Sequence, residues 1–550
     1  MRKTNRLLSL LLVGAMAIGL FGCGKTGAAS SATASTEKVS PMEISYVSLY
    51  CGEIVEDNWA EQYVQDALDI EIKTKKIDLT QAQQRDLMLA SNEMPDCGWI
   101  IKGSDTPKEL YNQGVTRTIP WDMIEQYAPN YAALLKNNPV GLNVNKDPIS
   151  GEYLALTGYT EGNSSSALYM TSYRYDWLQR LGIEPNGELI QLDEEGRLFM
   201  ATEPFTQSEF TEILKRFTED DPDGNGKDDT FGLALSQRST FFWTGLYGMY
   251  NITTAGAIEE NGSAERYFVT EKYKDFLKYM AELYEGGFID QEFATLDVNQ
   301  AWEKVANGQA GVCGISAKWT GPGISYAQTR APNVALNQNP EAKVVIVPTE
   351  VNDEGKGGAQ PYTVTNYNYT FFVNKNVSDE KLAKILEMFD FMNFDSEAKI
   401  ALRYGEEGTH FHWTDEENSR GPVLNEGVTN GGETGLLVYN SNYIETKDIV
   451  EMKMDGVQSK IAEYTYGPFA KNLTLPYRID LFNETQYAQL ISIYGATLDT
   501  LVDEFFYNSI GGNLDIDAEW DAYIAQLESS GYNQIREELQ KAPLYTDLVQ

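Results

Sequence analysis

The chain has 550 residues, of which 42% are apolar and 12% aromatic, so it can bury sizeable cores and is not a disordered chain. The formal net charge is −38, and a field of this sign repels nucleic acid and anionic lipid, which argues against both as partners. At roughly 100–200 residues per domain, the length predicts two or three domains.

The N-terminus has the pattern of a secretory signal peptide. A basic head, Met1-Arg2-Lys3, precedes an almost unbroken apolar run over 7–21. Because this run is shorter than the roughly 20 residues that a membrane-spanning helix needs, we interpret residues 1–22 as a leader. No later apolar run approaches that length, so no further membrane span is expected.

Residues 20–23, Leu-Phe-Gly-Cys, resemble a bacterial lipobox, in which Cys23 takes a lipid, with palmitate among its acyl chains, and becomes the mature N-terminus. The alternative is an ordinary signal peptide with an incidental cysteine. Residues 26–40 are rich in Ser, Ala, Thr and Gly, so we expect 23–42 to form a lipidated, flexible tether. With this anchor, the protein would act outside the cytoplasm at a membrane surface.

From about residue 43, strand and helix patterns alternate along the chain. Such alternation predicts a parallel sheet in an α/β layer architecture. The strands are expected at 44–50, 70–74 and 97–101, and the helices at 57–68 and 81–90.

Three later segments have helical start signals followed by apolar stripes. Thr206 and Glu209 form a capping box, Ser378 is placed to cap a second helix, and a third helix runs from about Asp517. We interpret the three apolar stripes as core. No repeat at a fixed period is present, which argues against a solenoid.

Three cysteines remain if Cys23 carries lipid. An odd number argues against a disulfide framework, so we expect Cys51, Cys97 and Cys313 to be buried thiols, although one bridge remains possible. The absence of a Cys-x-x-Cys pair excludes a zinc site of that type.

The segment 221–229 is rich in oxygen-bearing side chains at alternate positions, with Gly226 for a sharp turn. Ca²⁺ takes six to eight oxygen ligands, and this spacing wraps them around one point. A true EF-hand would need Glu at position 232, but Gly232 lies in a strand pattern over 231–235. We therefore predict a structural calcium loop between a helix and a strand, the alternative being a solvated turn without metal.

The two histidines, His410 and His412, are expected to alternate on one face of a strand. With Glu406 and Glu407 nearby they could bind a transition metal, but a hydrogen-bonding role near a hinge or cleft fits the spacing better. Nucleophile elbows, P-loops and dinucleotide-binding glycine motifs are absent from the sequence, so an enzyme activity has no positive support.

Aromatic residues are plentiful, and sugar rings pack their C–H faces on aromatic side chains. The aromatic residues expected in loops are Tyr50, Trp99, Trp243 and Trp319. Core packing is an equal alternative for each one alone. Together they favour a carbohydrate ligand.

Five short segments occur in a characteristic order along the chain. They are Met94-Pro95-Asp96, residues 173–182 with Arg174-Tyr175-Asp176-Trp177-Leu178, the calcium loop with Phe231-Gly232-Leu233, residues 404–411, and the tail 510–523. This order resembles the large extracellular solute-binding lipoproteins of Gram-positive ABC importers, in the LplA-like carbohydrate group.

The resemblance implies a two-lobe, periplasmic-binding-protein-like α/β fold of type II, with hinge strands and a ligand cleft. Lobe 1 would comprise 43–160 and 365–405, and lobe 2 would comprise 165–360 and 410–550. Such a protein closes over a sugar or oligosaccharide and delivers it to permease subunits. The resemblance also implies a monomer at the extracellular face of the cytoplasmic membrane, anchored through Cys23.

The resemblance suggests ligands for the calcium site, whereas the residues of the sugar site are expected from the chemistry of their side chains. The calcium ligands would be Asp221, Asp223, Asn225, the carbonyl of Lys227, and Asp229, with Thr230 where some relatives add a Glu. Arg174 or Arg403 could bind an acidic sugar. The expected ligand contacts are Tyr50, Trp99, Arg174, Trp243, Trp319 and His412.

Two other functions remain open at this point. A surface glycan hydrolase or lyase would need a pair of acids roughly 5–10 Å apart in the cleft. A sensor subunit would present its ligand to a signalling receptor instead of a permease.

Overall fold

The computed structural model describes residues 40–49, 51, 53–79, 81–91, 93–101, 107–147, 149–160, 169–254, 256–260, 262–316, 333–357, 369–440, 443–453, 461, 477–478, 485–544 and 547. The chain divides into two units, 1–41 and 42–550, and the described helices and strands all lie in the second. The predicted leader, Cys23, nearly all of the tether, Tyr50 and Trp319 lie outside the described residues.

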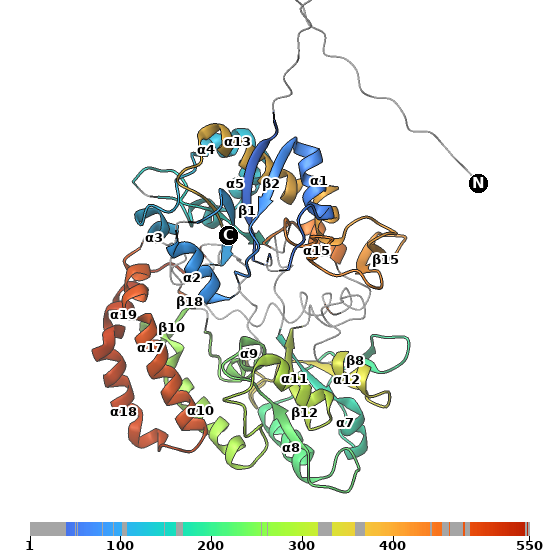
Figure 1. Ribbon diagram of the computed structural model, residues 1–550. Helices are drawn as coiled ribbons and strands as arrows, with labels where there is room; N and C mark the ends of the chain where they lie inside the picture. Colours follow the sequence, from blue (N-terminus) through green and yellow to red (C-terminus); the bar gives the residue numbers. More distant parts are fainter. Residues whose placement is uncertain are drawn as a thin grey trace, which may run out of the picture. The chain divides into compact units, whose positions relative to one another are not determined.

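A five-stranded sheet organises the first hydrophobic core (Figure 1). The first three strands in the chain are parallel, as predicted, because the helices between them return the chain to the same edge. Two more strands complete the sheet: one from far along the chain runs antiparallel to the first three, and the last strand pairs antiparallel with it and so runs in the same direction as the first three. The order is β2 (Ile70–Thr74), β1 (Met42–Val47), β3 (Cys97–Ile101), β14 (Tyr369–Val373) and β4 (Leu156–Thr157).

The helices of this first core begin at residues with good capping chemistry. Asn58 caps α1 (Trp59–Leu68), and the Ser378 hydroxyl accepts from the backbone N–H of Lys381 at 3.2 Å, as predicted. The helix that Ser378 caps, α13 (Asp379–Phe394), packs against β1 and four other helices of this core. The remaining helices are α2 (Ala82–Ala90), α3 (Pro107–Asn112), α4 (Trp121–Tyr127), α5 (Pro129–Lys136), α6 (Pro139–Asn143) and α14 (Ala398–Tyr404).

A six-stranded sheet organises the second hydrophobic core. Four of its strands run in one direction, and β6 (Tyr169–Arg174) runs antiparallel between two of them. The order is β7 (Leu189–Gln191), β8 (Leu198–Ala201), β13 (Val344–Pro348), β6, β12 (Ala310–Ser316) and β9 (Phe231–Ala234). The strand predicted over 231–235 is therefore β9.

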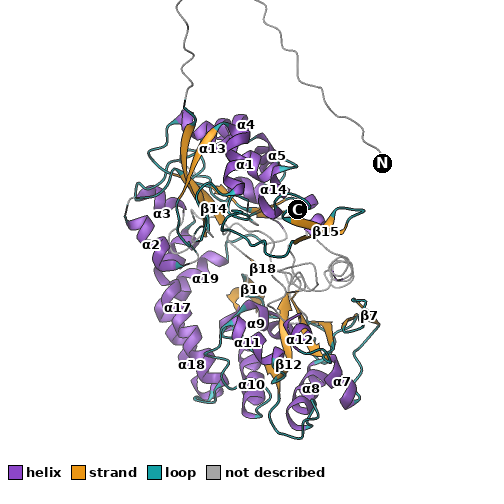
Figure 2. Cartoon of the chain, turned by 45° about the vertical axis from the view of Figure 1, so that its right-hand side comes forward, coloured by secondary structure: helices purple, strands orange, loops and turns teal. Residues whose placement is uncertain are grey.

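Helices pack on the second sheet and extend the same core (Figure 2). The predicted capping box is present, since the Thr206 side chain accepts from Glu209 N–H and the Glu209 side chain accepts in return. The helices are α7 (Tyr175–Leu181), α8 (Gln207–Glu219), α9 (Thr240–Met249), α10 (Glu271–Glu285), α11 (Val298–Ala306), α12 (Asn333–Gln338), α17 (Gln486–Ile510), α18 (Ile516–Leu527) and α19 (Asn533–Leu539).

Small elements complete the fold, and one of them corrects an expected boundary. The expectation placed all of 410–550 in lobe 2, but Val438, Tyr439, Tyr443 and Ile444 lie in the first core. The reason is pairing, since β17 (Ile444–Glu445) adds to β5 (Tyr159–Thr160). The other elements are β10 (Ala257–Glu260), β11 (Ser263–Arg266), β15 (Phe411–Asp415), β16 (Arg420–Leu424), β18 (Tyr477–Arg478) and α15 (Lys447–Lys453).

Two sequence predictions can be compared directly with the described part of the chain. Cys51, Cys97 and Cys313 are buried free thiols, as expected. Among the described residues, no helix combines the length and apolar character needed to cross a bilayer.

Candidate functional site

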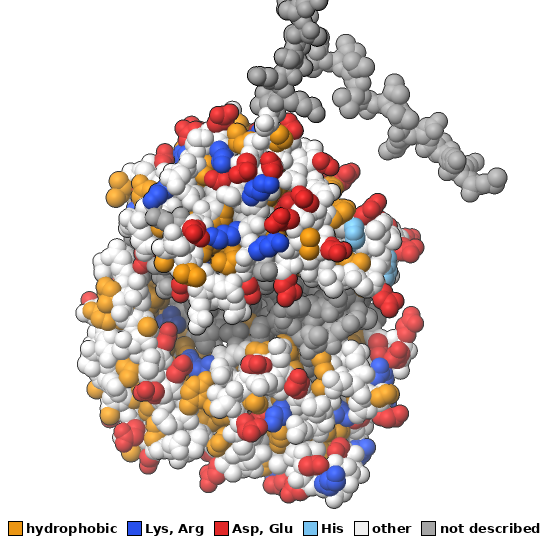
Figure 3. Space-filling view, in the orientation of Figure 1, with side chains coloured by type: hydrophobic (Ala, Val, Ile, Leu, Met, Phe, Trp, Pro, Cys, Tyr) orange, Lys and Arg blue, Asp and Glu red, His pale blue; other side chains and the backbone are white. Residues whose placement is uncertain are grey.

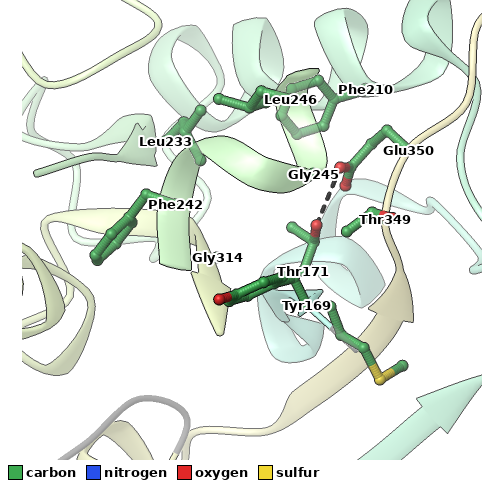
Figure 4. Close-up of a pocket in the computed structure, with 11 residues that line it drawn as sticks. Tyr169, Thr171, Phe210, Leu233, Phe242, Gly245, Leu246, Gly314, Thr349 and Glu350 are labelled. Carbon is green, nitrogen blue, oxygen red and sulfur yellow. Dashed lines mark hydrogen bonds between the residues drawn. The ribbon is translucent and has the colours of Figure 1, made fainter. Parts of the chain in front are cut away.

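A small pocket lies at one edge of the six-stranded sheet. Because β8, β13, β12 and β9 run in the same direction, their carboxyl ends share that edge, and the antiparallel β6 begins there. Ligands of open α/β sheets bind outside the carboxyl ends of the strands. The lining residues are Tyr169, Met170, Thr171, Phe210, Leu233, Phe242, Gly245, Leu246, Gly314, Thr349 and Glu350 (Figure 4).

Glu350 is the titratable acid of this pocket, and it is only 1% exposed. Its carboxyl group accepts a hydrogen bond from the Thr171 hydroxyl at 3.0 Å (Figure 4). It also accepts one from the Tyr173 hydroxyl. Burial raises the pKa of Glu350, since these hydrogen bonds only partly offset the cost of desolvating a charge. The same burial, with Glu350 beside it, raises the pKa of Tyr173 well above its ordinary value.

The first core holds a buried glutamate with a similar pair of partners. Glu61 accepts from the Tyr439 hydroxyl at 2.7 Å and the Thr74 hydroxyl at 3.0 Å. It also accepts from the backbone N–H of Asp57 at 3.2 Å, and it lies in the first turn of α1, where the helix dipole favours negative charge. Glu61 therefore has a favourable electrostatic setting that Glu350 lacks.

Trp99 and Trp243 lie in the cores, not at a surface where a sugar could stack. Each is 1% exposed, so the structure corrects the prediction that their rings contact ligand. The Trp99 ring packs against Tyr443 at a centroid distance of 4.9 Å. The Trp243 ring packs against Phe506 at 4.9 Å, and its indole N–H donates to the Ser236 carbonyl at 2.8 Å.

The two candidate arginines are also internal, which corrects their suggested role with an acidic sugar. Arg174 is 4% exposed and binds the Asp176 carboxylate through two hydrogen bonds of 2.9 and 2.6 Å. Arg403 is 1% exposed and donates to the Asn440 side chain at 2.9 Å. Acidic side chains, in contrast, are spread over the face seen in Figure 3, in keeping with the net charge of −38.

The histidines do not form the expected pair on one strand. His410 precedes β15, and its ring accepts from the Glu406 backbone N–H at 3.0 Å and packs edge-on against Trp59 at 5.1 Å. His412 lies within β15, is exposed, and hydrogen-bonds to the Asn425 side chain at 2.8 Å. Each imidazole ring therefore has a local hydrogen-bond partner.

The predicted calcium loop joins α8 to β9, and its acidic side chains converge on Asn225. The Asn225 amide group donates to Asp223 at 2.8 Å and to Asp229 at 3.0 Å. The Asp221 carboxylate accepts from the backbone N–H groups of Asn225 and Gly226, each at 3.0 Å. Gly226 has φ 76°, a left-handed conformation that glycine adopts at little cost.

The same loop settles the role of Thr230. Thr230 is buried and its hydroxyl donates to the Phe217 carbonyl at 2.9 Å, so it holds the end of α8 instead of facing the loop. Among the described residues, no group of three or more His, Cys, Asp or Glu side chains is arranged to hold a metal ion as it stands. In this loop the Asn225 amide group occupies the position between the carboxylates.

Three proteins of known name are similar to this chain in sequence. Lipoprotein LipO of Bacillus subtilis is 26% identical, and the match covers 67% of each chain. The polygalacturonan/rhamnogalacturonan-binding protein YtcQ of the same organism is 25% identical over 67% of this chain and 69% of its own. The fructooligosaccharide ABC transporter substrate-binding protein FusA of Streptococcus pneumoniae is 22% identical over 82% and 80%. No family model matches the chain.

Solved structures with a similar fold also include solute-binding proteins. A solute-binding protein of Bifidobacterium longum infantis that binds HMO superposes with a TM-score of 0.68 at 17% identity, over 91% of this chain and 98% of its own. FusA with kestose superposes with a TM-score of 0.66 at 18% identity over the same shares. In sequence and in fold, the chain is similar to named solute-binding and substrate-binding proteins of ABC transporters. The predicted two-lobe binding-protein fold is thereby confirmed, and YtcQ, FusA and the Bifidobacterium protein are named for binding or transport, not for catalysis.

Sequence reasoning missed Glu350 and its pocket. The available signal was position, because Thr349 and Glu350 directly follow the apolar strand Val344–Pro348. A polar pair at the carboxyl end of a buried strand is a reasonable candidate for a ligand-facing edge. The sequence could not show that the carboxyl group is buried against β6.

Proposed function

We propose that this chain is an extracellular, lipid-anchored solute-binding protein that captures a sugar or oligosaccharide for an ABC importer. The observation that carries the proposal is the match with FusA, which spans 82% of the chain in sequence and 91% in structure. YtcQ and the HMO-binding neighbour support a carbohydrate ligand, since both are named for binding carbohydrates. Permease subunits are the expected partners, and the working form is a monomer.

Such a protein needs no catalytic group. It needs two arrangements of its lobes and a ligand that binds one arrangement better than the other. The lobes are proposed as 43–160 with 365–405, extended by 436–445, and 165–360 with the remainder of 410–550. Anchoring through Cys23 would keep the captured sugar close to the importer.

Ligand binding is tested with the full mature chain by thermal shift and calorimetry. The probes are 1-kestose, trigalacturonate and lacto-N-tetraose, with a mixture of amino acids and short peptides as the control. A ligand that binds only the folded state raises the apparent stability by about 2.7 kcal/mol at a hundred times its Kd. A response to peptides with none to any sugar would overturn the carbohydrate proposal, and shortening of a bound oligosaccharide would reveal a hydrolase.

We further propose that the loop 221–229 binds a structural Ca²⁺. The residues that would hold it are Asp221, Asp223, Asn225, the carbonyl of Lys227, and Asp229, all of which supply oxygen. A half-turn of the Asn225 amide group would present its oxygen in place of the NH₂ that now faces two carboxylates. The ion would neutralise these acids and fix the loop. A neighbouring structure is described as an EF-hand mutant of FusA, which supports a related loop in that protein.

A further inference from the structure

The pocket at the carboxyl edge of the six-stranded sheet holds a cavity for one small group. Its volume of about 10 Å³ is close to the minimum that a single water molecule requires. Most of its wall is apolar, including Phe242 and Leu246 from α9 (Figure 4). A hydroxyl group fits this space, whereas a sugar ring does not.

Glu350 has hydrogen-bonding capacity left toward this cavity. A protonated carboxyl group has about three acceptor positions and one O–H donor, and Tyr173, Thr171 and its own backbone N–H use at most the acceptor positions, which leaves the O–H to donate toward the cavity. Both side-chain donors are neutral hydroxyls, and none of the ion pairs found in the described part of the chain includes Glu350. A buried carboxyl group without a charged partner is stabilised by one more hydrogen-bonding neighbour.

Gly245 keeps the space beside Glu350 open. A Cβ at this position would meet Thr349 Cγ2 at 2.7 Å and would come within 3.9 Å of Glu350 Oε2. Any larger residue on this turn of α9 would therefore push Thr349 and narrow the cavity. The helix approaches the strand ends without filling the gap in front of the carboxyl group.

We propose that this cavity binds one neutral hydroxyl group, which the carboxyl group of Glu350 holds by a hydrogen bond. In the free protein the occupant is a water molecule, and in the complex it is a hydroxyl of the bound sugar. The second half of this inference rests on the proposed carbohydrate-binding function, and the first half does not.

The water is tested first, in a high-resolution crystal structure of the free mature chain. We expect an ordered water within hydrogen-bonding distance of Glu350 and of at least one other polar group of the cavity. In Glu350→Gln, which keeps the side-chain shape, the water should shift or be lost. A dry cavity in the wild-type chain would overturn the inference.

The sugar hydroxyl is tested by calorimetry with 1-kestose, trigalacturonate and lacto-N-tetraose. For any of these that binds, Glu350→Gln should weaken the affinity about tenfold, and Glu61→Gln, the matched buried glutamate of the other core, should leave it within twofold. Equal affinities of wild type and Glu350→Gln would overturn the sugar half. If none of the three sugars binds, the proposed ligand class and the sugar half fail together, while the crystallographic water still decides the cavity.

Discussion

Replacing Glu350 with Gln is expected to remove one pH-dependent contribution to folding stability. Burial raises the pKa of Glu350 in the folded chain, while the unfolded chain keeps an ordinary value near 4.5. Between these two values the native state holds a proton that the unfolded state has lost. The stabilising contribution of the proton is complete below about pH 4.5 and disappears as the pH rises through the folded value.

The size of the effect follows from linkage. In the window where one proton separates the two states, the free energy of unfolding falls by about 1.4 kcal/mol per pH unit. Asp290 and Asp390 are also buried with raised pKa values, so they contribute in the same direction. Both remain in Glu350→Gln, and the difference between the two proteins isolates Glu350.

The titratable groups near Glu350 do not add to the proton difference between wild type and Glu350→Gln in this pH range. Tyr173 on β6 donates to it, and Tyr279 on α10 is affected by its charge. Both tyrosines have pKa values raised further above 10 by burial, so they remain protonated. Glu209 on α8 acts on Tyr173 and is retained in the variant.

Proton release on unfolding is the appropriate assay, because a chain with two cores need not unfold in two states. The wild type should release up to about one proton more than Glu350→Gln when urea unfolds it between pH 5 and 7. Its urea midpoint should also fall faster with pH than that of the variant. Equal proton release, with parallel pH profiles, would show that Glu350 is ionised in the folded protein and would refute the reasoning.

Three further outcomes are expected. Trp243→Ala should lower the free energy of unfolding in urea by about 3–5 kcal/mol, because a large buried ring is lost and the Ser236 carbonyl loses its hydrogen-bond donor. The Kd of the folded fraction for a sugar should stay unchanged. Weaker sugar binding at normal stability would instead support a stacking role for Trp243. A chelator should lower the melting temperature of the wild type but not of Asp223→Asn, and equal shifts would count against calcium in the loop. Cys23→Ala should move the protein from the membrane fraction to the medium, and an unchanged distribution would contradict lipidation.

Features that depend on neighbours in sequence were predictable. The capping box at Thr206, the cap at Ser378 and the individual strands β1, β2 and β3 each follow from residues within a few positions of one another. The parallel pairing of the three strands follows from their alternation with helices. The turn of the loop 221–229 was recognisable for the same reason, since glycine and acidic residues at fixed spacing determine it.

Features that depend on distant partners were not predictable. Glu350 is buried because Thr171, 179 positions earlier, lies beside it on β6. Tyr439 joins the first core by stacking on Tyr46 at 5.4 Å, and no local signal marks such a contact. For Trp99 and Trp243, the sequence pattern placed the rings in loops, whereas Trp99 lies in β3 and Trp243 in α9. The direction of each ring is set by core partners that are distant in the sequence.

The position of the loop 221–229 relative to the pocket separates the proposed calcium site from the proposed sugar site. The loop ends at Asp229, two positions before the first residue of β9, Phe231, whereas the pocket contains Leu233 and lies at the carboxyl edge of the same sheet. A strand of four residues rises roughly 13 Å, so an ion in the loop and a ligand in the pocket would lie at opposite ends of β9. Calcium would then support the fold without contacting the sugar. Asp223→Asn should therefore lower the melting temperature while the Kd for a bound sugar changes less than twofold, and a large loss of affinity at unchanged stability would place the loop in the binding site instead.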